Sequence, residues 1–185
     1  MNVIASPLPG VLVIEPRVHG DARGFFLETF NEGRYAEHGI HGPWVQDNLS
    51  KSAPGVLRGL HYQWPEPQGK LVSVVEGEVW DVAVDIRRGS PTFGQWYGTL
   101  LDAESHRQLW VPPGFAHGFV VTQGPAVFAY KCTAPYRAEY DAGVAWDDPD
   151  LAVDWPSRDV QVSDKDAKLP RLKDIAEDRL PVYGV

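Results

Sequence analysis

The chain has 185 residues, with 17 Lys or Arg against 25 Asp or Glu, which gives a formal net charge of −8. This acidic balance argues against a nucleic-acid partner, which needs a basic face. No apolar run approaches the roughly 18 residues of a membrane-spanning helix. Met1 to Pro16 lacks the pattern of a secretory signal, and the single cysteine, Cys132, cannot form an internal disulfide. We therefore expect a cytoplasmic protein.

Short β-forming runs separated by turn residues predict an all-β protein, and 18 Gly, 16 Pro and 21 aromatic residues suit such a chain. Gly77 divides two of these runs, which predicts a hairpin at that glycine. Trp80, Val82, Val84 and Ile86 alternate with another set of residues that includes Asp81, as in a strand of period two. The density of strands is typical of a sandwich or barrel. The predicted strands are 11–15, 25–30, 56–63, 70–76, 78–87, 94–101, 108–111, 118–121 and 126–132.

Helices are expected in only two places. Asn31 to His38 has the length of one short helix, and Ser163 could cap a second helical segment near the end of the chain. Residues 165–178 are charged and interrupted by Pro170, so we expect short helices packed on the outside of the barrel. Neither a linker nor a second domain is indicated, and residues 1–185 are predicted to form one domain.

Three polar stretches interrupt the predicted strands. Arg23 beside Gly24 could present a guanidinium group to a phosphate or carboxylate, although a surface arginine in a turn explains the same pattern. Arg58 and His61 lie within an apolar run, where burial without partners is costly. Strict alternation places them on opposite faces of the strand, so they share a pocket only if Gly59 or Leu60 forms a bulge. The alternative for His61 is an ordinary core or surface histidine.

The third stretch, Pro112 to Phe119, contains Pro-x-Gly-x-x-His and resembles the second motif of the cupin barrels, in which the histidine is often a metal ligand. The other cupin motif would supply His-x-His and a downstream Glu, but here His61 is followed by Tyr62 and Gln63. Two histidines without a carboxylate make a poor transition-metal site, which generally needs three or four ligands. We therefore expect no metal.

Taken in order, these motifs resemble the dTDP-4-dehydrorhamnose 3,5-epimerase family from about residue 10 to residue 168. The resemblance implies a cupin-like jelly-roll barrel that forms a homodimer and needs no cofactor. It also implies 3,5-epimerisation of dTDP-4-dehydro-6-deoxy-D-glucose to dTDP-4-dehydro-L-rhamnose, a step of dTDP-L-rhamnose biosynthesis. The segments that carry it are GDARGFF (20–26), QDN (46–48), VLRGLHYQ (56–63), QGKLV (68–72), DVAVDIR (81–87), SPTFG (90–94), PGFAHGF (113–119) and YK (130–131).

The resemblance also implies roles for four catalytic residues. His61 matches the base that removes a proton next to the C4 ketone, and Asp166 matches the carboxylate that orients it. Tyr130 matches the proton donor for the opposite face of the sugar. Lys70 matches the group that faces the C4 oxygen, where an ammonium stabilises the enolate. Without the resemblance, ordinary structural roles would suffice: a solvated helix residue for Asp166, a packed aromatic for Tyr130 and a strand-edge lysine for Lys70.

A further set matches family positions that contact the nucleotide sugar: Arg23, Glu28, Gln46, Asp47 through its backbone, Asn48, Arg58, His117, Tyr136, Asp141 and Lys165. The arginines suit the diphosphate, and Tyr136 matches the position that stacks on thymine. Two positions depart from the family pattern. His19 stands where many members have an aromatic residue, in a segment that can reach the neighbouring subunit's site. Asp141 stands where a Glu is frequent and is one methylene shorter.

Alternative functions remain open from the sequence. A C5- or C3-monoepimerase or a 3,4-ketoisomerase on a related dTDP-hexulose would use the same barrel. A barrel that only binds a sugar nucleotide would lack proton exchange, and a metal-dependent cupin enzyme would lose activity on chelation.

Overall fold

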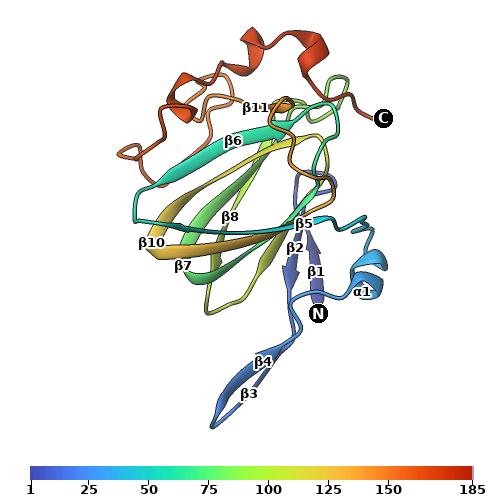
Figure 1. The fold of residues 1–185 in the computed structure, drawn as a ribbon, viewed down its shortest axis with the longest axis vertical. Helices are drawn as coiled ribbons and strands as arrows, with labels where there is room; N and C mark the ends of the chain where they lie inside the picture. The colour runs from blue at the N-terminus through green and yellow to red at the C-terminus, as the bar shows by residue number, and fades with distance from the viewer. Residues whose placement is uncertain (185) are drawn as a thin grey trace.

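Two long antiparallel strands dominate the computed structural model, which describes residues 1–184. β7 (Lys70–Asp85) and β10 (Phe115–Cys132) pair from Asp85 opposite Phe115 to Lys70 opposite Cys132. Figure 1 shows them side by side through the middle of the barrel. The predicted runs 70–76 and 78–87 are therefore parts of one strand, as are 118–121 and 126–132.

The hairpin predicted at Gly77 is wrong. Gly77 lies inside β7 with φ +79°, where a Cβ would come within 2.6 Å of the carbonyl oxygen of Pro125. The pairing of β7 with β10 changes register between Val121 and Val127, directly across from this glycine. Both strands therefore bend together and continue, because a glycine can provide a bend within a strand as well as a turn between strands.

The bend divides the barrel into two layers that share β7 and β10. Beside the second half of β7 and the first half of β10, the first layer contains β8 (Trp96–Asp102), β6 (Leu57–Gln63) and β11 (Asp141–Gly143). Beside the other halves, the second layer contains β9 (Gln108–Val111), β2 (Leu12–Glu15), β1 (Asn2–Ala5) and β5 (Gln46–Ser52).

The main hydrophobic core fills the space between these layers. Val72, Ala83, Phe119 and Phe128 belong to this cluster and are almost completely buried. The alternation predicted along the second half of β7 is confirmed. Ala83 faces the main core, whereas its neighbour Val82 faces a separate core on the outer side of the first layer. Both faces of this half of the strand are therefore covered by apolar cores.

The C-terminal segment covers this outer core, as the sequence predicted. It forms three single-turn 3₁₀ helices, which lie over β6 and β11 in Figure 1: η1 (Asp166–Lys168), η2 (Leu172–Asp174) and η3 (Glu177–Arg179). Leu172 and Leu180 anchor the segment in the core. The other predicted helix is also present as α1 (Glu32–Ala36), where the side chain of Asn31 accepts a hydrogen bond from the Arg34 N–H at 3.2 Å.

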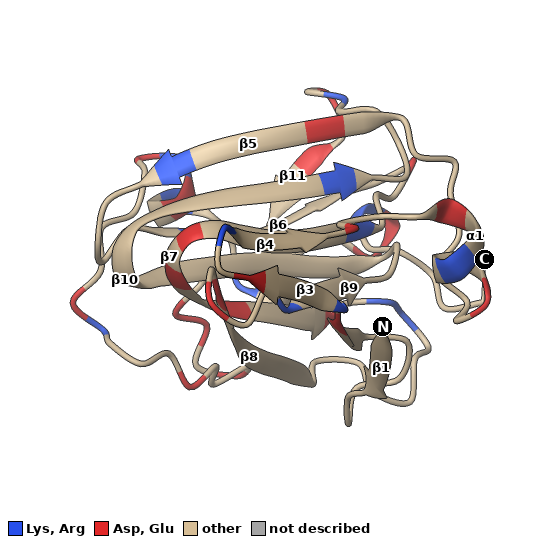
Figure 2. Ribbon diagram, turned by 90° about the horizontal axis from the view of Figure 1, so that it is seen from below, with Lys and Arg blue, Asp and Glu red and all other residues tan. Residues whose placement is uncertain are grey.

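A two-stranded hairpin projects from the barrel. β3 (Val18–Asp21) pairs with β4 (Gly24–Leu27), and Figure 1 shows the hairpin extending away from both layers. The Phe25 and Phe26 side chains on it are 62% and 71% exposed. Figure 2 shows basic and acidic residues interspersed over the strands and loops around the barrel. Among the described residues, no helix is long and apolar enough to cross a membrane.

Candidate active site

Three of the predicted catalytic side chains meet between the two layers. His61, Lys70 and Tyr130 line both of two adjoining cavities, whose volumes are about 250 Å³ and 100 Å³. The three residues come from β6, β7 and β10, so strand pairing rather than sequence proximity brings them together. The resulting pocket combines an imidazole, an ammonium and a phenol.

An irregularity in β6 brings Arg58 and His61 to the same side. His61 pairs with His117 and Arg58 pairs with Phe119, so three steps along β6 correspond to two steps along β10. Both side chains line the larger cavity, which confirms the bulge on which the shared pocket depended. Gly59 has φ +128°, and a Cβ there would lie 2.6 Å from the Gly118 Cα. A glycine is therefore needed at the bulge.

The predicted pairing of His61 with Asp166 is present in the structure. The Nε2 atom of His61 lies 2.7 Å from Oδ1 of Asp166, and the Gly59 N–H donates to Oδ2 of the same carboxylate at 3.2 Å. Burial alone would raise the pKa of Asp166, but hydrogen bonds from His61, Gly59 and Ser163 hold it below the ordinary value. An ionised Asp166 favours the His61 tautomer with its proton on Nε2 and the lone pair on Nδ1.

Lys70 and Tyr130 are both partly buried in the pocket. Burial lowers the pKa of the Lys70 ammonium, although Cys132, Asp141 and Asp81 act in the opposite direction. Burial raises the pKa of the Tyr130 phenol, which keeps it protonated at neutral pH. No ion pair to Lys70 occurs within residues 1–184, so its ammonium is available to an oxygen atom that develops negative charge.

Alternation along β5 divides the 46–48 motif between two surfaces. Gln46 lines the smaller cavity, and its side chain donates to Asn48 at 2.9 Å and accepts from the Tyr136 N–H at 2.8 Å. Asn48 in turn donates to the sulfur of Cys132 at 3.6 Å. Asp47 instead faces outward and forms an ion pair with Lys131 at 2.8 Å. Its side chain is therefore directed away from the cavities that His61 lines.

Three predicted binding residues form a polar group at the mouth of the smaller cavity. Asp141 forms an ion pair with Lys165 and accepts a hydrogen bond from the Tyr136 hydroxyl at 3.1 Å. Tyr136 is 54% exposed, so part of its side chain is accessible from solvent. Asp141 is on β11, whose Gly143 pairs with His61, and this pairing fixes the position of Asp141 relative to His61.

Arg23 and Glu28 are not brought to this pocket. Arg23 is at the tip of the β3–β4 hairpin, where its guanidinium pairs with Asp21 at 2.6 Å and is 89% exposed. Glu28 pairs with Arg34 at 2.8 Å near the base of the hairpin. His19 is exposed on the same hairpin. None of the three lines either cavity that contains His61.

Sequence reasoning missed a second carboxylate–imidazole pair. His117 lines the larger cavity as predicted, but its Nε2 lies 2.9 Å and 3.0 Å from the two carboxylate oxygens of Asp81. Asp81 is completely buried. The signal was a charged residue in the alternating apolar pattern of β7, on the same face as Val79 and Ala83, because a buried carboxylate requires a partner.

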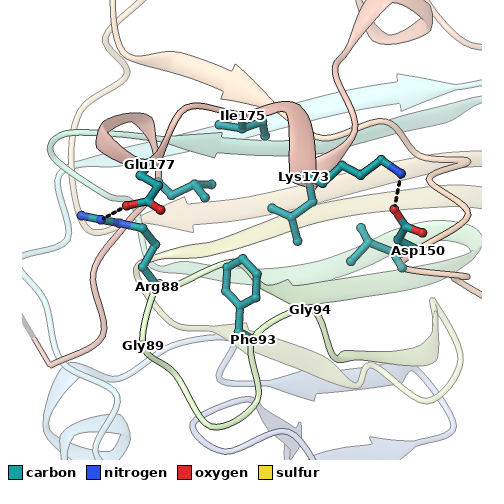
Figure 3. Close-up of a pocket in the computed structure, with 11 residues that line it drawn as sticks. Arg88, Gly89, Phe93, Gly94, Asp150, Lys173, Ile175 and Glu177 are labelled. Carbon is teal, nitrogen blue, oxygen red and sulfur yellow. Dashed lines mark hydrogen bonds and ion pairs between the residues drawn. The ribbon is translucent and has the colours of Figure 1, made fainter.

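A separate cavity shares no lining residue with this pocket. Its volume is about 660 Å³, and it is formed by the β7–β8 connection and the C-terminal 3₁₀ helices (Figure 3). Phe93 and Ile175 contribute apolar walls, and ion pairs of Arg88 with Glu177 and of Lys173 with Asp150 border it. Its lining contains no imidazole or phenol, whereas the pocket between the layers combines an imidazole, a phenol and the Lys70 ammonium and is the candidate active site. Within residues 1–184, no group of three or more His, Cys, Asp or Glu could hold a metal ion.

The fold and the site together define a cupin-like jelly-roll barrel with acid–base groups inside it, as predicted. A family described as dTDP-4-dehydrorhamnose 3,5-epimerase matches residues 5–174. The chain belongs to this family and is an isomerase.

Named relatives agree with this assignment. The dTDP-4-dehydrorhamnose 3,5-epimerase of Pseudomonas aeruginosa is 55% identical over 168 residues, which are 90% of this chain and 93% of that protein. The epimerase RmlC of Legionella pneumophila, solved in complex with dTDP-4-keto-L-rhamnose, superposes with a TM-score of 0.97 at 53% identity and covers 100% of this chain and 99% of its own. ChmJ, a 3'-monoepimerase of Streptomyces bikiniensis solved with dTDP-quinovose, gives a TM-score of 0.88 at 35% identity and covers 97% and 93%.

Proposed function

We propose that residues 1–185 form one catalytic domain that inverts C3 and C5 of dTDP-4-dehydro-6-deoxy-D-glucose and yields dTDP-4-dehydro-L-rhamnose. The observation that supports this most directly is the common lining of one pocket by His61, Lys70 and Tyr130. The 53–55% identity to a 3,5-epimerase and to an RmlC structure with the corresponding product supports double rather than single epimerisation.

Proton removal is the first step at each carbon. Nδ1 of His61 takes the proton from the carbon next to the C4 ketone, and the C–H electron pair moves to form an enolate on the C4 oxygen. Asp166, at 2.7 Å from Nε2, stabilises the imidazolium that forms. Lys70 stabilises the enolate oxygen as negative charge develops on it, which is usually the largest contribution in such a site.

Proton return completes the inversion. The Tyr130 O–H gives its proton to the same carbon from the opposite face, the enolate electrons form the new C–H bond, and the ketone is restored. Base and acid lie on different strands of the barrel, β6 and β10, which supports approach from two sides. Proton exchange with water resets the imidazolium and the phenolate after the first carbon is inverted, before the second carbon reacts, and again before the next turnover. Such acid–base steps contribute about 10²–10⁴-fold in rate.

The remaining predicted residues hold the nucleotide in this proposal. Arg58 and His117 bind the diphosphate, since both line the larger cavity beside Lys70. Tyr136 stacks on the thymine at the mouth, with Lys165 and Asp141 beside it. The free thiol of Cys132 is consistent with the cytoplasmic location that the sequence predicts.

The reaction is tested by proton NMR of the substrate and enzyme in D₂O. We expect deuterium at both C3 and C5 and a product with inverted configuration at both carbons. The His61→Ala variant should still bind dTDP but lose exchange at C5. Normal exchange in this variant would remove His61 from the mechanism.

The same experiment separates the alternative functions. Label at a single carbon would establish a monoepimerase, and movement of the ketone to C3 would establish a 3,4-ketoisomerase. Binding of dTDP without any exchange would leave a binding barrel. Loss of activity after treatment with a chelator would establish a metal-dependent enzyme.

We also propose that the protein is a homodimer in which the β3–β4 hairpin completes the partner's pocket. Arg23 and Glu28 lie outside their own chain's pocket, and the hairpin carries two exposed phenylalanines. Leu49 and Val75, on the outer face of the second layer, are 70% and 62% exposed. An apolar surface of this kind is typical of an interface between copies of a chain.

Mixing two inactive variants tests this arrangement. If the hairpin serves the partner, an Arg23→Ala chain and a His61→Ala chain form heterodimers with one intact site each. Random exchange at equal concentrations should then restore about a quarter of the wild-type activity. No recovery, with heterodimers demonstrated by native mass spectrometry, would place Arg23 in its own chain's site. A monomer in sedimentation analysis would refute the dimer.

A further inference from the structure

The second carboxylate–imidazole pair differs from the first in its surroundings. Asp166 accepts a hydrogen bond from the Gly59 N–H as well as from His61, and these donors stabilise its negative charge. Within residues 1–184, the only hydrogen-bond partner of the Asp81 carboxylate is His117, whose Nε2 lies near both oxygens. The Asp81 side chain has 0% exposure and that of His117 has 8%, so water contributes little to either.

A completely buried carboxylate with one donor needs a counter-charge. Transfer of an isolated carboxylate from water to a protein interior is costly, and a neutral N–H offsets only part of the cost. A protonated imidazole supplies a full positive charge at 2.9–3.0 Å. The surroundings of Asp81 therefore favour a proton on both nitrogens of His117, whereas those of Asp166 allow His61 to remain a neutral base.

The second nitrogen of His117 is open to the pocket. Nδ1 has no hydrogen-bond partner among the described residues. The side-chain nitrogens that are both unpaired and fully buried belong to Trp44, Trp80 and Arg88, so Nδ1 of His117 is not fully buried. It is therefore accessible from the larger cavity, which His117 lines. An N–H at this atom would donate directly to a ligand in that cavity.

The larger cavity suits an anion. It contains no carboxylate in its lining, while Arg58 and Lys70 contribute cationic side chains to it. Asp81 also acts on Lys70 through space, since its charge favours the protonated ammonium. The charged and titratable groups that face His117 are Asp81 and Lys70 on β7, Arg58 and His61 on β6, and Tyr130 on β10.

We propose that Asp81 is a positioning residue that keeps His117 doubly protonated, so that Nδ1–H of His117 is a fixed cationic donor to the substrate diphosphate. The inference rests on the proposed function for the identity of the anion. The two pairs then have opposite tasks in one pocket. His61 with Asp166 presents a lone pair that accepts a proton, and His117 with Asp81 presents an N–H that binds negative charge.

Nitrogen-15 NMR of the histidine side chains tests the protonation state in the folded wild-type protein. At pH 8 with dTDP bound, we expect both ring nitrogens of His117 to carry protons and one nitrogen of His61 to be unprotonated. A His117 ring with one unprotonated nitrogen under these conditions would overturn the proposal. This measurement needs neither a variant nor turnover, so it is decisive even if substitutions at position 81 prevent folding.

The Asp81→Asn variant tests the consequence for binding. Its amide preserves the shape of the side chain and can hydrogen-bond His117, but it cannot balance a positive charge. We expect dTDP to bind about 5- to 10-fold more weakly at pH 8, with a smaller difference at pH 5.5, where the higher proton concentration favours the imidazolium in both proteins. The KM should rise more than kcat falls. Unchanged dTDP affinity at pH 8 would refute the role of Asp81.

Asp166→Asn is the matched control, because it makes the same change in the other pair. It should leave the dTDP affinity within about twofold while kcat collapses. A pH-dependent loss of affinity in this variant would show that any carboxylate in the pocket has the effect, and it would overturn the division of tasks. Failure of epimerisation with a doubly protonated His117 would refute the proposed reaction alone.

Discussion

Asp166→Asn is the most informative substitution among the proposed catalytic residues, because it changes charge and hydrogen-bonding capacity but hardly changes shape. The amide must fill a position where Oδ1 now contacts Nε2 of His61 at 2.7 Å and Oδ2 accepts from the Gly59 N–H at 3.2 Å. If its NH₂ group faces Gly59, two buried donors oppose each other. If it faces His61, it donates to Nε2 and forces the proton onto Nδ1, which eliminates the base.

The size of the effect follows from these two orientations. To keep the His61 proton on Nε2, the new amide must turn its NH₂ group toward the Gly59 N–H. The two buried donors then face each other, which costs about 1–3 kcal/mol. Loss of the charge-assisted hydrogen bond to the imidazolium costs about 1.5–3 kcal/mol more. Because each 1.36 kcal/mol is a factor of ten in rate, kcat should fall by about 10²–10⁴-fold.

The assay is the rate of deuterium incorporation at C5 in D₂O, measured with saturating substrate. Asp164→Asn, in an exposed residue two positions earlier in the chain, is the matched control and should keep wild-type kcat. An Asp166→Asn enzyme with kcat within threefold of wild type, and with unchanged thermal stability, would refute the role of the carboxylate in selecting the tautomer.

Further outcomes follow from the same geometry. Lys70→Met should lower kcat by more than about 10²-fold, since the enolate would lose its cation, and a coupled reductase assay would measure this. Tyr130→Phe should retain deuterium exchange by His61 but lose net inversion, which NMR of the recovered sugar distinguishes. Gly77→Val should destabilise the fold by about 2–4 kcal/mol in urea unfolding, because φ is +79° and a Cβ would lie 2.6 Å from a carbonyl oxygen. Folding lowers the pKa of Asp166, so its ionised form stabilises the protein above about pH 4. The difference in unfolding free energy between wild type and Asp166→Asn should therefore shrink as the pH falls through the pKa of Asp166 in the folded protein.

Much of the strand pattern was predictable because the apolar residues repeat at the period of a strand. The segment 108–111 was predicted with its observed bounds, and the alternation around Val82 divides two cores as expected. The bend at Gly77 was misread because a glycine between two β runs has the same local signature in a turn and in a bent strand. Only the pairing with β10 distinguishes the two, and that pairing involves residues more than 40 positions away.

The sequence by itself determined an acidic β barrel, and its ordered motifs identified the family and the residues proposed to carry proton transfer. The resemblance predicted the pairing of His61 with Asp166, but only the tertiary structure showed the geometry of that pair and the existence of the pair of His117 with Asp81. Asp166 reaches His61 from 105 positions away, and Asp81 reaches His117 from 36. The tertiary structure also places Arg23 outside its own chain's pocket. The physical reason is that alternation specifies which face of a strand a side chain occupies, whereas its partner depends on register and bends set by many distant contacts.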